Sequence, residues 1–216
     1  MKKVVIFDFD YTLGDSTPGI VESMHYAFET MGLPKPSSDA IRRTVGRTLC
    51  DSYAILTGDE DISHGQRFTA LFKEKADEIM TGKTVLFDGI LECLAALKRK
   101  GVKLGIVTTK LRYRIEGIMA KYGAEDLFDL VVGSEDVKVE KPSPEGLLWA
   151  IDALKAAKED VLYVGDSIVD AKTAQNADVD FAAVLTGTTE REAFLEYPHV
   201  EIADNVTKIK ASPIGG

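Results

Sequence analysis

The sequence predicts an α/β fold: a parallel sheet with helices on both faces, plus an inserted all-helical cap domain. Two observations lead to this prediction. Short apolar runs alternate with helical patterns over most of the chain, as they do where crossover helices join parallel strands. Residues 15–83, in contrast, contain no convincing strand. A helical segment inserted after the first strand of such a sheet is typical of a cap.

The elements of the sheet domain follow from apolar runs and helical spacing. Five short runs predict strands, at 4–9, 103–107, 129–132, 161–165 and 180–184. Helical patterns predict helices at 88–100, 110–121, 143–157 and 168–177. Lys100-Gly101 is a typical helix end directly before a strand. We expect residues 1–15 and 84–216 to form the sheet domain.

The inserted segment predicts four helices of its own. Thr17-Pro18 opens the first, which runs to Met31 and is stopped by Gly32-Leu33-Pro34. The others are expected at 39–45, 48–57 and 63–80. We assign residues 16–83 to the cap domain.

Composition and charge restrict the class of protein and its partners. With 216 residues, of which 45% are apolar and 28% charged, the chain is typical of globular proteins. A formal net charge of −9 argues against a nucleic-acid partner, which requires a basic face. Apolar runs fall short of membrane-spanning length, and Met1-Lys2-Lys3 leads directly into a strand. We therefore expect a cytoplasmic protein with no membrane partner; its oligomeric state stays open.

The most informative stretch is the first strand and the two carboxylates that follow it. Val4 to Phe7 form an apolar run, and Asp8 and Asp10 come directly after it with one residue between them. At strand spacing both side chains share one face, at the carboxyl end of the strand, where open α/β sheets bind ligands. Two carboxylates so close require a cation or a shared proton. The pair therefore predicts a divalent metal or acid–base chemistry.

Polar side chains also follow later strands. Thr108 and Thr109 end the second core strand, Lys141 precedes a helix, and Gly165-Asp166 ends another strand with Asp170 four residues on. Strand ends of one polarity meet at one edge of a parallel sheet, so these groups are expected to converge on Asp8 and Asp10. Carboxylates for Mg²⁺, a hydroxyl and an ammonium together suit a phosphorylated substrate.

These motifs resemble those of the haloacid dehalogenase-like hydrolase superfamily, in the helical-cap branch that includes phosphoglycolate phosphatases. The resemblance rests on four segments in order: Asp8-Phe9-Asp10-Tyr11-Thr12, Thr108, Lys141 and Gly165-Asp166-Ser167-Ile168-Val169-Asp170. It implies a Rossmann-like core and a Mg²⁺-dependent phosphatase acting on a small phosphorylated metabolite such as a phosphoglycolate-like monoester.

The resemblance also implies a role for each matching residue. Asp8 is implied to be the nucleophile that forms an aspartyl-phosphate, and Asp10 the general acid and base. Thr108 and Lys141 are implied to contact the transferring phosphoryl group. Further residues complete the implied site: Thr12 and Thr109 for substrate, and Asp8, Asp10, Asp166 and Asp170 for the metal, with Asp10 contributing its backbone carbonyl.

Two positions depart from the pattern of the superfamily. Tyr11 stands where glycine is usual, and Thr109 where asparagine is frequent. Neither departure removes a catalytic group, but the first restricts the loop after the nucleophile or brings a phenol into the cleft.

Two cations remain open to more than one interpretation. Arg47, beside Gly46 in the cap, is a candidate for binding a second anionic group of the substrate, although arginines of the cap are also expected as ordinary surface residues. Lys110, directly after Thr109, is a second candidate near the phosphate. Arg47 is the preferred substrate-binding residue.

Other functions within and outside the superfamily stay open. Inorganic pyrophosphate hydrolysis fits the same residues. A phosphosugar mutase often has glutamate where this chain has Gly165, and a non-catalytic phosphate-binding protein is expected to lack the nucleophile or the acid, both of which are present. A dehalogenase lacks the second aspartate and needs no metal, so Asp10 and Asp166 argue against it.

Overall fold

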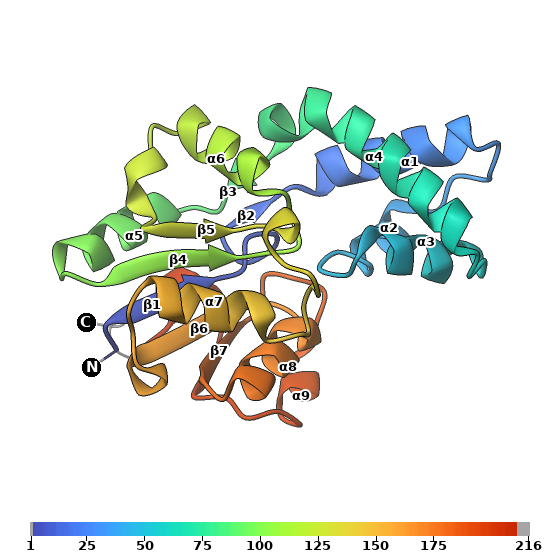
Figure 1. Cartoon of the computed structure of the whole chain (residues 1–216). Helices are drawn as coiled ribbons and strands as arrows, with labels where there is room; N and C mark the ends of the chain where they lie inside the picture. Colours follow the sequence, from blue (N-terminus) through green and yellow to red (C-terminus); the bar gives the residue numbers. More distant parts are fainter. Residues whose placement is uncertain (1, 211–216) are drawn as a thin grey trace. The chain divides into compact units, whose positions relative to one another are not determined.

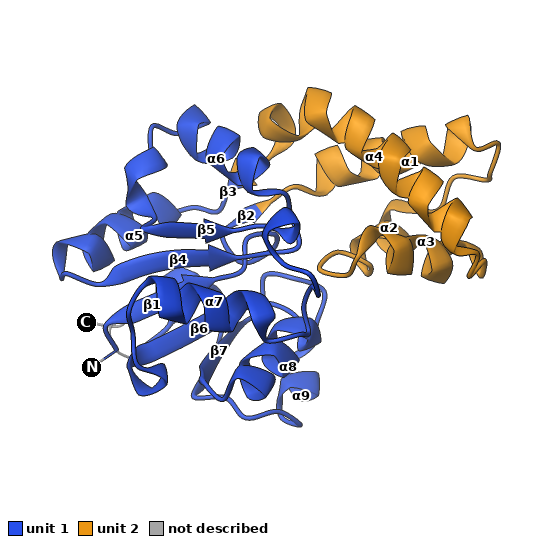
Figure 2. Ribbon diagram, viewed as in Figure 1, with its two compact units in different colours: residues 1–14, 86–216 blue, residues 15–85 orange. Residues whose placement is uncertain are grey.

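The computed structural model describes residues 2–210. It divides into two compact units, drawn in different colours in Figure 2: residues 1–14 with 86–216, and residues 15–85. The chain passes from one unit to the other at two points. There, β2 (Gly14–Asp15) and β3 (Val85–Leu86) pair as a two-stranded sheet. The boundaries expected from the sequence lay at 15/16 and 83/84.

Unit 1 is built on a six-stranded parallel sheet with the strand order β5-β4-β1-β6-β7-β8 (Figure 1). Its strands are β1 (Val4–Phe7), β4 (Lys103–Val107), β5 (Leu130–Val132), β6 (Val161–Gly165), β7 (Asp180–Val184) and β8 (Glu201–Ala203). Val4 pairs with Lys103 on one side and with Val161 on the other, which fixes the register of the central strand. The predicted parallel sheet is confirmed, and β8 is an additional strand.

Helices cover both faces of this sheet, and alternate strand residues pack against each layer. Val5 and Phe7 of β1 face a cluster that includes α5 (Ile90–Arg99) and α6 (Arg112–Lys121). Val4 and Ile6 face the opposite cluster, with α7 (Glu145–Ala153) and α8 (Ile168–Ala177). Both faces are apolar because crossover helices bury them both.

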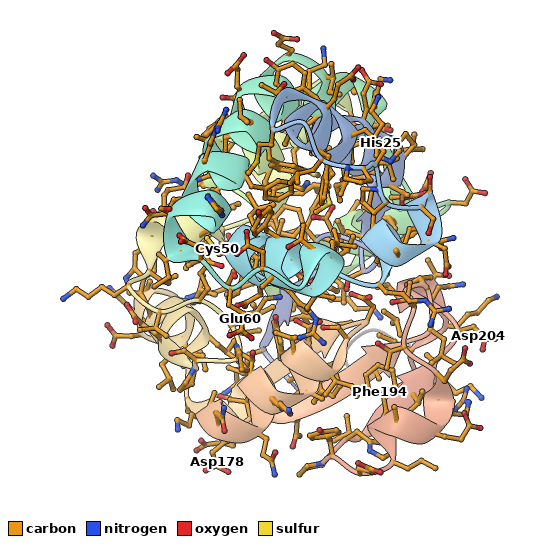
Figure 3. The ribbon with its side chains drawn as sticks, turned by 90° about the vertical axis from the view of Figure 1, so that its right-hand side faces the viewer. His25, Cys50, Glu60, Asp178, Phe194 and Asp204 are labelled. Atoms are coloured by element: carbon orange, nitrogen blue, oxygen red, sulfur yellow. The ribbon has the colours of Figure 1, made fainter. Side chains whose placement is uncertain are left out.

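A short helix, α9 (Arg191–Phe194), follows β7 and was not predicted. Its Phe194, labelled in Figure 3, is fully buried, and its ring centroid lies 6.2 Å from that of Phe181. Several predicted helices are shorter than expected. The segment 143–157 is helical over α7 alone because Lys155 adopts a left-handed conformation, with φ of 53°. The segment 39–45 is helical only over α2 (Ser38–Arg42).

Unit 2 is a helical unit with its own core. Its helices are α1 (Thr17–Thr30), α2, α3 (Leu49–Thr57) and α4 (Ile62–Lys83). Phe28, Tyr53 and Phe68 pack together at its centre, with the centroid of the Phe68 ring 5.4 Å from that of each of the other two. Within the described part of the chain, no helix is both long and apolar enough to cross a membrane.

The strand order creates a switch point beside β1. The chain leaves β1 toward β4 and β5, and then returns to place β6 on the opposite side of β1. In open α/β sheets, ligands bind outside the carboxyl ends of the strands at such a point. Asp8 follows β1 and Asp166 follows β6. The topology therefore brings the two predicted carboxylates to the position where a ligand is expected.

Candidate active site

The carboxyl edge of β1, β4 and β6 gathers a set of buried polar side chains. Eight of them are less than a tenth exposed: Asp8, Asp10, Thr12, Thr108, Lys110, Lys141, Asp166 and Asp170. All belong to unit 1. Charged residues are rarely buried to this degree unless they are paired or bind an ion. The contacts of each residue therefore show how its charge is stabilised.

The loop after β1 is held in a tight turn. The Asp8 amide donates to the Val164 carbonyl at 2.9 Å, which extends the strand pairing to the first carboxylate. The Leu13 amide donates back to the Phe9 carbonyl at 2.9 Å. Tyr11 is buried at the turn with φ of 61°, a left-handed conformation that favours glycine. This conformation explains why the superfamily usually has glycine at this position.

Lys141 joins three of the other side chains. Its ammonium lies 3.0 Å from Asp8 Oδ1 and 2.7 Å from Asp170 Oδ1, and it donates to the Tyr163 hydroxyl at 3.3 Å. Burial acts to lower the pKa of Lys141, but the negative charges of Asp170 and Asp8 outweigh it and raise this pKa well above its ordinary value. Lys141 is therefore held in its charged form between two carboxylates.

Asp170 uses both of its oxygens within the protein. Oδ1 accepts from Lys141 and from the Tyr163 hydroxyl, the latter at 2.9 Å. Oδ2 accepts from the Ser167 amide at 3.2 Å and the Ser167 hydroxyl at 2.6 Å, in a capping box at the start of α8. Asp170 therefore orients Lys141 and the first turn of α8 as well as adding charge to the site.

Asp166 differs from Asp170 because no described residue forms an ion pair with it. Its Oδ1 accepts a hydrogen bond from the Thr12 hydroxyl at 3.3 Å. Burial raises the pKa of Asp166 well above its ordinary value, and the negative charges of Asp170 and Asp8 add to this rise. Burial likewise raises the pKa of Asp8 to about 6, against the opposing effect of Lys141. The site therefore carries more negative charge than the protein alone neutralises.

This excess charge fits a divalent cation. Asp8, Asp166 and Asp170 each offer an oxygen, and these oxygens lie within 4.8 Å of one another. Of these, the Asp8 Oδ1 atom is buried and accepts no hydrogen bond with good geometry from the described residues. Oxygen ligands of this kind suit Mg²⁺. The residues present thus fit the predicted metal.

Asp10 is paired with a different lysine. The Lys110 ammonium lies 3.1 Å from Asp10 Oδ2. The Lys110 amide donates to the Thr108 hydroxyl at 3.3 Å, so the Thr108 hydroxyl lies close to the backbone of Lys110. Thr109, between them, is half-buried. The sequence singled out Lys110 only as a cation near the phosphate and did not predict its pairing with Asp10.

Arg47 is not part of this buried cluster. It is an exposed residue of unit 2, and its amide donates to the Thr44 carbonyl at 3.1 Å in the turn after α2. Its side chain is available to solvent, and its role stays a proposal.

Three residues of the site were not predicted. Tyr163 of β6 is fully buried, and its hydroxyl contacts Lys141 and Asp170. In the loop after β7, the Thr186 hydroxyl donates to the Tyr11 carbonyl. A Cβ on Gly187 would lie 1.9 Å from Asp166 Oδ2, so the backbone there closes over this carboxylate. For Gly187, the sequence signal that could have indicated a role was a glycine in the loop after a strand.

Comparison with known proteins identifies the family. The model of the haloacid dehalogenase-like hydrolases matches residues 5–184. The chain belongs to this family. Its fold is similar to that in the crystal structure of a haloacid dehalogenase-like hydrolase from Bacteroides fragilis, with a TM-score of 0.93 and 43% identity over 95% of this chain and 98% of the other. The resemblance drawn from the four motifs is confirmed.

Relatives similar to this chain in sequence include phosphatases. A phosphoglycolate phosphatase from Psychrobacter arcticus is 30% identical over 86% of this chain and 84% of its own length. A pyrophosphatase, PpaX, from Halalkalibacterium halodurans is 32% identical over 83% and 82% of the two chains. This haloacid dehalogenase-like protein is accordingly an enzyme, a phosphoric monoester hydrolase.

Proposed function

We propose that the protein is a Mg²⁺-dependent phosphatase that hydrolyses a small phosphorylated metabolite through an aspartyl-phosphate at Asp8. The observation that carries the proposal is the buried cluster at the carboxyl edge of β1 and β6, where three carboxylates offer oxygens within 4.8 Å of one another and Lys141 lies 3.0 Å from Asp8. Phosphoryl transfer needs mainly positioning and positive charge, and this cluster supplies both.

In the proposed first step, an Asp8 oxygen attacks phosphorus and the bond to the leaving oxygen breaks. Asp10 gives its proton to that oxygen. Lys141, fixed by Asp170 and the Tyr163 hydroxyl, neutralises Asp8 and the phosphoryl group together. Thr108 is proposed to donate its hydroxyl to a phosphoryl oxygen, and Thr12 and Thr109 to help to bind the phosphate.

In the second step, water attacks the phosphorus of the aspartyl-phosphate. Asp10 takes the proton from this water, and the bond between phosphorus and Asp8 breaks to release phosphate. Asp8, Asp166 and the Asp10 carbonyl would hold Mg²⁺, and Asp170 would support the ion directly or through water. Bound there, Mg²⁺ would offset the charge that develops on the phosphoryl oxygens.

The names of the relatives support two candidate substrate classes. Phosphoglycolate phosphatases and pyrophosphatases are both similar to this chain at 30% and 32% identity. A phosphoglycolate-like monoester is the preferred substrate, and inorganic pyrophosphate is the second candidate. The two substrates differ in the leaving group, which carries a carboxylate in phosphoglycolate and is itself a phosphate in pyrophosphate.

A screen of phosphorylated metabolites with Mg²⁺ tests the proposal. It includes phosphoglycolate, sugar phosphates, nucleoside monophosphates and pyrophosphate, with EDTA and Asp8→Asn as controls. We expect phosphate release to be lost with EDTA and to fall by about 10³-fold or more in Asp8→Asn, because the nucleophile is gone. An active Asp8→Asn protein would contradict the mechanism. Folded wild-type protein that releases no phosphate from any compound would favour a mutase or a binding protein.

We further propose that Arg47 binds the second anionic group of the substrate. Its exposed guanidinium is suited to a carboxylate or phosphate. For Arg47→Ala we expect KM for the preferred substrate to rise by about tenfold, the worth of one such contact, with little change in kcat. Arg43→Ala, which removes an exposed arginine already paired with Asp39, is the matched control. Equal KM values for the two variants would remove Arg47 from the site.

A further inference from the structure

The ion pair between Lys110 and Asp10 is buried. Lys110 Nζ lies 3.1 Å from Asp10 Oδ2, with side-chain exposures of 5% and 11%. Solvent therefore screens this pair far less than a surface pair. Within the described residues, Lys110 is also the sole cation that forms an ion pair with Asp10. Lys110 therefore places a positive charge directly beside this carboxylate.

The backbone of Lys110 is fixed on both sides. Its amide donates to the Thr108 hydroxyl at 3.3 Å, and its carbonyl accepts from the Ser134 amide at 3.1 Å. Lys110 lies in the short connection between β4 and α6 (Figure 1). The backbone from which the Lys110 side chain extends is therefore fixed at the edge of the sheet, and a residue that positions another group requires this.

The two oxygens of Asp10 have different surroundings. Oδ2 contacts Lys110, whereas Oδ1 is buried and accepts no hydrogen bond from a described residue. Burying a carboxylate oxygen without a partner costs free energy, and a catalytic role is one reason why a protein retains such an atom. The pair thus holds one oxygen and leaves the other for exchange of a proton.

Lys110 and Lys141 serve different carboxylates. Lys141 forms ion pairs with Asp8 and Asp170, and Lys110 with Asp10. One lysine therefore accompanies the proposed nucleophile and the other the proposed acid and base. Removing Lys110 leaves the charge beside Asp8 intact.

We propose that Lys110 is a positioning residue that holds Asp10 in the orientation for proton transfer, an inference that rests on the proposed function. In the first half-reaction Asp10 protonates the leaving oxygen as the phosphorus–oxygen bond breaks. In the second it takes the proton of water as water bonds to phosphorus and the bond to Asp8 breaks. Both transfers need the carboxylate aimed at the reacting oxygen.

A substrate whose leaving group needs no proton separates this role from phosphate binding. With 2,4-dinitrophenyl phosphate the first half-reaction is independent of Asp10, while hydrolysis of the aspartyl-phosphate still depends on it. We expect Lys110→Met to release one equivalent of dinitrophenolate in a rapid burst and then to turn over about 10²-fold more slowly than wild type, the low end of acid–base effects. Asp10→Asn should show the same burst. Lys110→Arg should recover part of the turnover rate that Lys110→Met loses after the burst.

The controls distinguish the other outcomes. Lys158→Met removes an exposed lysine of unit 1 and should match wild type. If Lys110→Met raises KM and shows no burst, Lys110 binds phosphate and the proposal is wrong; kinetics equal to wild type also overturn it. If Lys110→Met does not fold, the split between burst and turnover is measured in Lys110→Arg, where an unchanged slow phase together with a raised KM overturns it. Wild-type protein that never forms an aspartyl-phosphate defeats the proposed function instead.

Discussion

The two units of the protein bury very different polar groups. In the described part of the chain, every buried charged side chain belongs to unit 1, and most of these lie in the cluster around Asp8 and Lys141. The buried polar side chains of unit 2 are all hydroxyls: Ser16, Ser23, Thr44, Ser52 and Thr84. Each unit nevertheless has a full apolar core.

This difference separates residues kept for chemistry from residues kept for stability. Burying a charge costs free energy unless a partner or an ion offsets it. Asp166 has no ion-pair partner among the described residues, so its burial is explained by function. The hydroxyls of unit 2 bond to nearby groups, as Ser23 does to the Gly19 carbonyl at 2.7 Å. The buried polar residues of unit 2 are thus explained by stability alone.

The largest expected effect on stability is in the core of unit 2. Phe68 is fully buried and contacts the rings of Phe28 and Tyr53. We expect Phe68→Ala to destabilise this unit by about 3–5 kcal/mol, because it leaves a cavity among the aromatic rings. Hydrogen exchange should show faster exchange in α1, α3 and α4 than in β1 and β6. Equal acceleration in both units would mean that they unfold together and would weaken the comparison.

A smaller effect of opposite sign is expected at Asp166. Burial raises the pKa of Asp166 and of Asp8, so the folded protein favours the protonated form of both carboxyl groups. The stability that this form provides is fully present at low pH and is lost as the pH rises through the raised pKa values. Asp166→Asn should therefore raise the Tm of metal-free protein at pH 7.5, by roughly 2–6 °C for the removal of one such charge, and abolish Mg²⁺-dependent activity.

The same linkage predicts how Mg²⁺ affects the wild type. Metal binding requires ionised carboxylates, so Mg²⁺ should raise Tm more at pH 7.5 than at pH 5, on either side of the pKa of about 6 at Asp8. In Asp166→Asn this difference should disappear. A metal-free Asp166→Asn protein less stable than wild type would show that Asp166 is a structural residue.

The smallest effect is expected at an exposed pair of unit 2. His64 Nδ1 lies 2.7 Å from Asp59 Oδ2. Asp59 lies in the loop before α4, and His64 lies in the first turn of this helix. Hydrogen bonds from the Asp61 amide and from His64 lower the pKa of Asp59 to about 2, and the pairing raises that of His64 above 6.5. The Asp59 contribution is lost as pH falls below 3.8, and the His64 contribution as pH rises above 6.5.

The pair should therefore stabilise unit 2 most between these pH values, and only slightly because both groups are exposed. Comparing Tm against pH for wild type and His64→Gln measures it. The two curves should differ most near pH 5 and converge above pH 8. A difference that persists at pH 9 would assign the effect to packing rather than to charge.

Much of the fold was predictable because periodicity and helix ends are local signals. The ranges of β4, β6, β7 and α8 agree with the sequence prediction. The shortened α7 was not predictable because its end depends on Lys155 in a left-handed conformation, which lysine does not signal. The strand β8 was missed because its residues, Glu201 to Ala203, lack a clear apolar run.

The candidate site shows the same division. Asp8, Asp10 and Asp166 were predictable because they follow strands, and Lys141 because it precedes a helix as part of a motif. The contact of Gly187 with Asp166 joins loops far apart in sequence, and only the folded chain shows it. The dual role of Tyr163 was hidden because a tyrosine in an apolar strand is also a normal core residue.

Chemical trapping of the intermediate tests the central claim most directly. Borohydride reduces an aspartyl-phosphate to homoserine, which peptide mass spectrometry locates in the chain. After a quench during turnover of phosphoglycolate, or of the best substrate found in the screen, we expect homoserine at position 8 and none at Asp10 or Asp166. Homoserine at another aspartate, or none in protein that is actively releasing phosphate, would contradict the account.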